Sequence, residues 1–502
     1  MAWRRFCSFR TKRSLQPISS SEIIVPETHR DFTYPDPMRQ RNLPPEIIHM
    51  ILSLVSRDSL ASSSLVCKIW RAITLPLLYE SISLISTTNG PHYKTWLNFS
   101  RFDNHPDELV DRVICETNDE DLFQISDCVH RLTVAWRMNE QQLQNFSLAV
   151  LKMKNLKHLS WAVSVVKKIG WYDTLAMFCQ RLPQLHSVQL VLPFNELSIP
   201  NKGMNALINL KTLSVGFDQP PMVFERGREI PITIVRFVTG AQNIESLSLY
   251  PEELCSLRVV DVMSRLSLHQ FPRLRKLCIG SLCRQVPLQR FSYSAFGIWH
   301  FIRNQKQLQE LMFYAYGGSD RSSWSIFPQG IGAMPSIRRF GGTTAIIPAL
   351  LRSGLIGQLE VLDIIHTENS TPVALSDLLH DRVLKGLSLI FPRLKGLRIS
   401  ISDSETPNNT ERAINILGML AAGAPELEEL ILSTSQPLNK HNWDSLFEAI
   451  TKLPSLRRLG FSTTWLGLPG GLPDYQTFSE RAKALCPELV IVYDPEFTST
   501  LS

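Results

Sequence analysis

A short apolar pattern returns through the last two thirds of this 502-residue chain and constrains its fold more than any other feature. The pattern is Leu-x-x-Leu-x-Leu, often with proline two residues before it, as in PQLHSVQL and PRLRKLCI. The first apolar residues of its copies are Leu156, Leu185, Leu210, Ile244, Leu274, Leu308, Ile337, Leu359, Leu394, Leu427, Leu456 and Leu489. These twelve copies predict a stack of similar units, each beside its neighbours, rather than one closed core.

Each unit is expected to contain one short strand and one helix. The Leu-x-Leu alternation has the period of a β-strand with one buried face. Helical segments are expected between copies, for example at residues 172–182, 411–423 and 442–453. In seven copies the proline disfavours helical backbone in the residue before it, so the helix ends before the strand starts. Stacking such units builds an α/β solenoid, to which residues 129–136 add one degenerate earlier copy.

The repeats resemble the leucine-rich-repeat family, and this resemblance implies an irregular solenoid of horseshoe form. Two features depart from the family pattern. The steps between copies range from 22 to 35 residues, and the asparagine that the family places after each strand is missing. The weakest copy, RRFGGTT, starts at Arg338 and leaves open a break into two domains at that point.

Two short apolar helices are expected before the repeats begin. In NLPPEIIHMILSLV and SLVCKIWRAI, apolar residues recur at helical spacing. The predicted faces contain Ile47, Ile51, Leu54 and Val55 in the first segment and Leu65, Ile69, Trp70 and Ile73 in the second. Pro44 and Pro45 suit the first turn of a helix, where no backbone donor is needed. Asp58 or Ser59 is expected to cap a helix that begins there.

Residues 42–73 resemble an F-box, through Leu43-Pro44, Glu46-Ile47, Asp58, Leu60 and the stretch SLVCKIW. The resemblance implies a helical module that docks on the Skp adaptor and, through it, on the cullin of a ubiquitin ligase. A module of roughly 40 residues buries too little apolar surface alone, so the adaptor is expected to cover the rest. By the same resemblance, the adaptor-binding residues are Leu43, Pro44, Ile47, Ile51, Leu60, Leu65, Val66, Cys67 and Trp70. The alternative is a helical cap that shields the first repeat.

The expected fold class is α/β, with a short helical F-box followed by the repeat solenoid. The expected parts are a disordered basic tail at 1–38, the F-box at 39–82, a linker with a first repeat-like segment at 83–128, the solenoid at 129–496 and a C-terminal tail at 497–502. Residues 75–84, LPLLYESISL, resemble the start of the repeat region in fungal F-box proteins. The first segment has no acid before Glu22, so an organelle transit peptide or a weak nuclear signal remains an alternative to a disordered tail.

Composition and motifs exclude several classes of protein. The hydrophobic fraction of 44% is too high for a disordered chain, and a formal charge of +6 is too small for a typical nucleic-acid binder. No apolar run is long enough to cross a bilayer. Nine cysteines lie scattered without zinc-ligand spacing, so we expect reduced thiols in a cytoplasmic or nuclear protein. No catalytic, phosphate-binding or metal motif stands in a suitable context, and we expect no enzyme activity and no cofactor.

Function is therefore expected on the face of the strands that the leucines do not occupy. The predicted substrate-binding residues are Tyr250, Lys276, Met312, Tyr314, Arg339, Arg398 and Arg458. Their arginines suit an acidic or phosphorylated segment of a protein substrate. The sequence thus predicts a substrate receptor of a Skp–cullin–F-box ligase. A leucine-rich-repeat scaffold without a ligase role is the alternative, and an enzyme with a dispersed site is a third reading.

Overall fold

The computed structural model describes residues 43–85, 106–116, 123–136, 138–163, 170–192, 207–217, 232–250, 262–263, 265–280, 295–314, 336–343, 350, 354–365, 391–401, 414, 417–418, 423–434, 443–461 and 472–493. The chain divides into two compact units, residues 1–54 and 55–502. The first unit has one described helix, and the second unit contains the strands and the other described helices.

Helix α2 (Pro45–Ser53) belongs to the first unit. Pro44 is its N-cap and Pro45 its first residue, as the sequence predicts, because proline has no backbone N–H to leave unpaired there. Glu46 lies in the first turn, where a negative charge is favourable. Only Ile48 and Leu52, four residues apart, are buried. The helix is therefore apolar on two faces and buries one of them.

The second unit begins with two further helices, α3 (Arg57–Ser63) and α4 (Lys68–Tyr79). The predicted cap of α3 at Asp58 or Ser59 is wrong. Ser56 is the N-cap, and its side chain accepts a hydrogen bond from the backbone N–H of Ser59 at 3.4 Å. In α4, Pro76 lies inside the helix, and the Thr74 hydroxyl donates to the Trp70 carbonyl at 2.5 Å.

In the described part of the chain, fourteen parallel strands follow, and each pairs with the next. The strands are β1 (Ser81–Ile85), β2 (Arg131–Ala135), β3 (His158–Ala162), β4 (Ser187–Leu192), β5 (Thr212–Phe217), β6 (Ser246–Tyr250), β7 (Lys276–Gly280), β8 (Glu310–Tyr314), β9 (Arg339–Thr343), β10 (Val361–Ile365), β11 (Gly396–Ile401), β12 (Glu429–Thr434), β13 (Arg458–Phe461) and β14 (Val490–Tyr493). This order is that of stacked repeats, because no strand is inserted between two neighbours. The expected boundary between residues 82 and 83 falls inside β1, which already pairs with β2.

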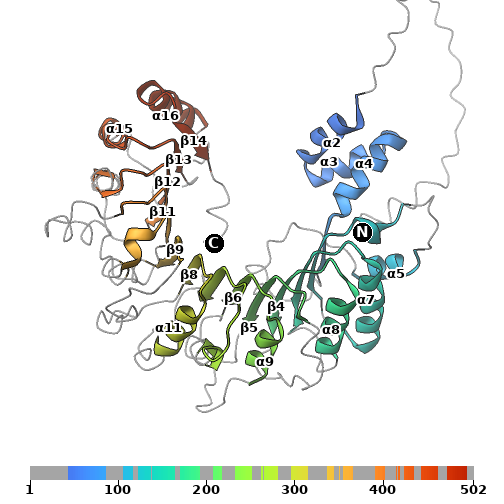
Figure 1. The fold of residues 1–502 in the computed structure, drawn as a ribbon. Coiled ribbons are helices and arrows are strands. Elements are labelled where there is room, and N and C mark those ends of the chain that lie inside the picture. Colours follow the sequence, from blue (N-terminus) through green and yellow to red (C-terminus); the bar gives the residue numbers. More distant parts are fainter. Residues whose placement is uncertain are drawn as a thin grey trace, which may run out of the picture. The chain divides into compact units, whose positions relative to one another are not determined.

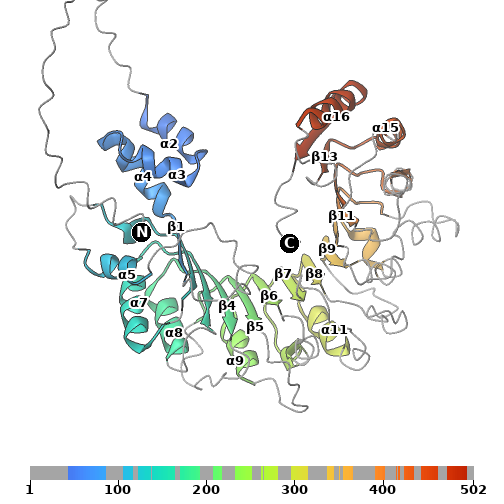
Figure 2. The ribbon, with the colours of Figure 1, turned by 180° about the vertical axis from the view of Figure 1, so that it is seen from behind.

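Helices connect many of these strands and lie along one side of the sheet. They are α5 (Pro106–Ile114), α6 (Ile125–Cys128), α7 (Glu140–Lys152), α8 (Trp171–Arg181), α9 (Ile232–Gly240), α11 (Ala295–Asn304), α15 (Trp443–Thr451), α16 (Leu472–Leu485) and the 3-10 helix η8 (Gly354–Gln358). Figures 1 and 2 show α7, α8, α9 and α11 on the same side of their strands. The helices expected at 172–182 and 442–453 are α8 and α15, whereas most of 411–423 lies outside the described residues.

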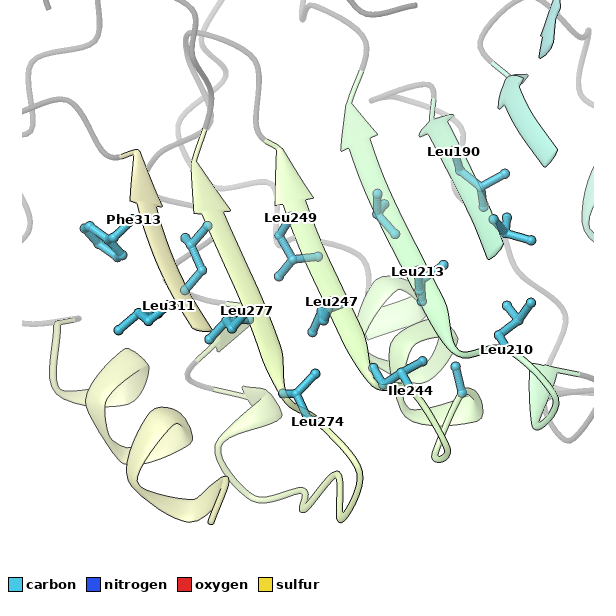
Figure 3. Close-up of a cluster of buried hydrophobic side chains, with 14 of the residues drawn as sticks. Leu190, Leu210, Leu213, Ile244, Leu247, Leu249, Leu274, Leu277, Leu311 and Phe313 are labelled. Atoms are coloured by element: carbon cyan, nitrogen blue, oxygen red, sulfur yellow. The ribbon is translucent and has the colours of Figure 1, made fainter. Parts of the chain in front are cut away.

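The leucines of the repeat form the core between sheet and helices. Eleven of the twelve first apolar residues are buried, and Leu456 is partly buried. The second apolar residues pair in register from strand to strand, as in Leu247–Leu277–Leu311, and are fully buried. Figure 3 shows these side chains in rows across β4 to β8. The strand with one buried face, predicted from Leu-x-Leu, is confirmed.

The weakest copy of the pattern forms a regular strand. Residues of β9 pair in register with β8 and with β10, so the ladder has no break there. Phe340 takes the place of the usual leucine and is fully buried. A Cβ atom added at Gly341 would lie 2.2 Å from the Met312 sulfur, so this glycine makes room for the neighbouring side chain.

Polar side chains at the turn before the strands link one repeat to the previous one. The Asn155 side chain donates to the Asp127 carbonyl at 2.7 Å, and Asn243 donates to the Ile208 carbonyl at 3.0 Å. Ser455 makes the same kind of bond to Pro425 at 2.8 Å. Each donor stands directly before the first apolar residue of its copy. These bonds satisfy turn carbonyls, a task that the family gives to an asparagine after the strand.

Candidate functional site

The first candidate surface is the exposed apolar face of α2. The exposed fractions are 37% for Ile47, 55% for Met50, 47% for Ile51 and 86% for Leu54. Leu43, just before the helix, is 51% exposed. These residues recur at helical spacing, so they form one stripe on the side opposite Ile48 and Leu52. Burying one such side chain against a partner contributes about 1.5–3 kcal/mol, so the stripe is a candidate docking surface.

A second exposed apolar group lies at the start of α4. Leu65 is 56% exposed, Val66 64% and Ile69 52%. Leu65 and Val66 precede the helix, which starts at Lys68 rather than at Ser64 as the predicted face implied. The Arg71 side chain donates to the Ser64 carbonyl at 3.2 Å and holds this turn against α4. We call the exposed apolar residues of 43–69, namely Leu43, Ile47, Met50, Ile51, Leu54, Leu65, Val66 and Ile69, the N-terminal apolar set.

The predicted adaptor-binding residues divide by exposure. Seven of the nine are exposed: Leu43, Pro44, Ile47, Ile51, Leu65, Val66 and Cys67. Trp70 is half-buried, and Leu60 is buried with 7% of its surface exposed, so Leu60 is a core residue of its helix. The prediction omitted Met50, Leu54 and Ile69, although Leu54 and Ile69 stand at the helical spacing already noted. Whether these residues bind an adaptor stays a prediction.

The second candidate surface is the face of the sheet opposite the leucines, here called the polar face. Strand alternation places two rows of side chains on it. The strand register aligns the first row as Ser81, Arg131, His158, Ser187, Thr212, Ser246, Lys276, Glu310, Arg339, Val361, Gly396, Glu429, Arg458 and Val490. The second row is Ser83, Thr133, Ser160, Gln189, Ser214, Ser248, Cys278, Met312, Gly341, Asp363, Arg398, Ile431 and Gly460.

From β7 to β13 the charges on the polar face alternate in sign from one strand to the next. The order is Lys276, Glu310, Arg339, Asp363, Arg398, Glu429 and Arg458, and we call this set the charge ladder. Lys276 lies 3.3 Å from Glu310, and Arg458 lies 3.7 Å from Glu429. Neighbouring strands thus neutralise one another.

Asp363 is the most buried acid of the charge ladder, with 8% of its surface exposed. Arg339 donates to its Oδ2 atom from two nitrogens, at 2.7 and 3.0 Å. The Arg398 Nε atom lies 3.8 Å from its Oδ1 atom. Two guanidinium groups on opposite sides therefore compensate the charge of the buried carboxylate, while its Oδ1 atom accepts no hydrogen bond within the described residues.

The predicted substrate-binding residues take the expected register positions on the polar face. Lys276, Arg339 and Arg458 lie in the first row, and Met312 and Arg398 lie in the second. Tyr250 pairs with Gly216, and Tyr314 pairs with Gly280, one step further along their strands. The side chains of these two tyrosines lie outside the described residues. Met312 is buried, with 5% exposed. Substrate binding by these residues stays a prediction.

The described residues offer little for catalysis. They contain no group of three or more His, Cys, Asp and Glu side chains arranged to hold a metal ion. Burial raises the pKa of the Cys179 thiol to about 12, and burial together with Asp127 and Glu116 raises that of Cys128 to about 11. A thiol with so high a pKa is a poor nucleophile at neutral pH. No helix in the same part of the chain is long and apolar enough to cross a bilayer.

Comparison with known proteins finds a family for the N-terminal helices but not for the repeat sheet. A crystal structure of a Bacteroides fragilis protein aligns with 68% of this chain and 66% of its own length, at 13% identity and a TM-score of 0.23. The chain thus spans just under two thirds of that protein, and a likeness this low carries no functional argument. No curated protein matches. Residues 40–85 match the F-box-like family, so the chain contains an F-box-like domain that spans α2, α3, α4 and β1.

Proposed function

We propose that this chain is the substrate-recognition subunit of a Skp–cullin–F-box ubiquitin ligase. The F-box-like match at residues 40–85 carries the proposal. In this function the F-box-like domain binds the Skp adaptor, the adaptor binds a cullin, and the leucine-repeat sheet holds a protein substrate. The chain itself makes and breaks no bond. It raises the concentration of the substrate near a ubiquitin-loaded enzyme held elsewhere in the assembly.

The exposure of the N-terminal apolar set supports this function over a cap. A cap that shields the first repeat would bury its apolar faces against the sheet. Leu65, Val66 and Ile69 instead keep more than half of their surface exposed. The contacts toward the first repeat come from the end of α4: the Tyr79 and Phe123 ring centroids lie 6.1 Å apart, and the Glu80 carbonyl accepts backbone hydrogen bonds from His130 and Arg131.

The test is co-expression of the full chain with the Skp adaptor, followed by gel filtration. We expect a stable complex that is lost in Leu43→Ala/Pro44→Ala and in Leu65→Asp/Val66→Asp. The second variant changes side chains that are already exposed, so the chain should remain folded. Because each buried apolar side chain contributes about 1.5–3 kcal/mol, the loss of two should weaken binding about a hundredfold or more.

The matched control is Leu148→Ala/Leu485→Ala, which truncates two exposed leucines outside the domain. It should leave the complex intact. A folded full chain that ignores the adaptor overturns the proposal, and so does a complex that survives both variants of the N-terminal apolar set. Recovery of the adaptor without a cullin would instead favour a scaffold without a ligase role.

A further inference from the structure

Five basic side chains gather where β2, β3 and β4 begin. They are His130, Arg131, Lys157, His158 and His186, and we call them the basic cluster. Backbone hydrogen bonds fix their relative positions, because Lys157 and His158 both donate to the His130 carbonyl at 2.9 and 3.0 Å. His186 donates to the Lys157 carbonyl at 3.2 Å, and the rings of His158 and His186 lie 5.1 Å apart.

The side chains of the basic cluster are not held in ion pairs, unlike several basic side chains of later repeats. Within the described residues, none of its five members forms an ion pair with a carboxylate. At the equivalent turn positions of later repeats, Lys211 pairs with Glu245 at 3.9 Å and Arg338 with Glu360 at 3.3 Å. Lys211 and Arg338 are therefore compensated by a neighbouring carboxylate, whereas Lys157, at the same turn position, is not.

The charged groups around the basic cluster do not neutralise it. At the C-cap of α4, the Glu80 carbonyl accepts hydrogen bonds from the backbone N–H groups of His130 and Arg131, and Glu80 is exposed. On α6, Asp127 is exposed. Just before β5, Lys211 is already paired with Glu245. Inside the cluster, burial lowers the pKa of His158, and His186, Arg131, Lys157 and His130 lower it further. The neighbouring basic groups thus disfavour a positive charge at His158, and an added anion would relieve that repulsion.

The spacing of the basic cluster suits an extended acidic segment better than a single compact anion. Adjacent strands lie about 4.8 Å apart, so side chains on three strands spread over about 10 Å. In an extended peptide, alternate side chains lie about 7 Å apart and point the same way. Two or three carboxylates of such a peptide can meet cations on different strands.

We propose that the basic cluster binds an acidic segment, a run of Asp and Glu side chains, of a partner protein. Arg131 and Lys157 carry the permanent charge, and the three histidine rings lie beside them. This inference rests on the proposed function, since the segment would belong to the recruited substrate. It places the anion contact at β2 to β4, whereas the arginines predicted from the sequence already have acidic neighbours.

The test measures binding of a fluorescent oligo-glutamate peptide to the purified full chain, with oligo-glutamine as the neutral probe. We expect oligo-glutamate alone to bind, and Arg131→Gln/Lys157→Gln to weaken it at least tenfold. The matched control, Arg338→Gln/Lys395→Gln, removes the same charge from paired positions of later repeats and should change affinity less than twofold.

Three results would overturn the inference: no binding by a folded chain, an equal loss in the control variant, or preference for inorganic phosphate or a phosphopeptide over oligo-glutamate. Thermal unfolding of each variant checks that the chain is folded. Adaptor co-elution is measured on the same preparations. Loss of peptide binding with adaptor binding intact overturns only this inference, and the reverse result overturns only the proposed function.

Discussion

The two halves of the polar face are built on the same core but use charge differently. In the first two rows of β1 to β6, Arg131 is the one residue with a permanent charge, and most others are serine or threonine. From β7 to β13, charges of opposite sign alternate and lie close together. One parallel repeat sheet can therefore pair its charges between neighbouring strands in one region and contain basic side chains without ion pairs in another. The second kind of region is the better place for a charged ligand.

The largest expected effect is a loss of stability when a leucine of the core, which both halves share, is truncated. Leu159→Ala in β3 and Leu397→Ala in β11 each remove a side chain that is 1% exposed. Each should lower the free energy of unfolding by about 2–5 kcal/mol, because a truncated core leucine leaves a cavity. Urea unfolding together with hydrogen exchange of the flanking strands measures both. A large difference between the two variants would show that the halves do not share one kind of core.

A smaller loss of stability should distinguish the charged half of the polar face from the half with serine and threonine. Asp363→Ala leaves Arg339 and Arg398 facing each other without their carboxylate, and should cost about 2 kcal/mol. Thr133→Ala, at a second-row position on β2, is the control and should cost well under half as much. The measurement is urea unfolding at low and high salt. Equal losses in both variants would mean that the charge ladder contributes no more than the hydroxyl rows.

Neutralising the basic cluster should not lower the stability of the chain, unlike the loss of Asp363. Because Arg131 and Lys157 have no carboxylate partner in the described residues, Arg131→Gln/Lys157→Gln should leave the unfolding temperature unchanged or raise it slightly. The same number of charges removed from the ladder, in Arg339→Gln/Arg458→Gln, should lower it. Thermal unfolding of the full chain compares the two directly. A marked loss in the first variant would reveal a stabilising role that contradicts the comparison.

The smallest effect is a pH dependence. The pKa of His158 is lowered in the folded chain, first by burial and then by the neighbouring basic groups. The unfolded chain therefore binds this proton at a higher pH than the folded chain does, and stability is lost as the pH falls below about 6.5. The urea midpoint of the wild type should fall more between pH 7.5 and pH 5.5 than that of His158→Asn. Identical shifts would exclude the repulsion that makes the basic cluster attractive to an anion.

Individual residues show which features of the fold could be predicted from the sequence. The repeat positions predicted strands and buried leucines, and even RRFGGTT follows them because Phe340 substitutes for leucine and Gly341 admits Met312. Leu60 shows the limit at the helices. The resemblance assigns it to the adaptor surface with its neighbours, yet it is buried, because it is the one large apolar side chain of α3 and forms the buried side of that helix.

The sequence by itself determined most of the strand positions and the presence of an F-box-like domain, since each depends on a local period or motif. It predicted twelve copies and one degenerate copy, whereas the described residues form fourteen strands, because β1 already pairs with β2. Only the tertiary structure decided which charges lie side by side. Lys276 and Glu310 are 34 residues apart, so their pairing depends on strand register rather than on sequence distance (310 − 276). The basic cluster likewise emerges only when β2, β3 and β4 align. Charge pairing is a property of neighbouring strands, and a linear sequence does not place neighbours from different repeats together.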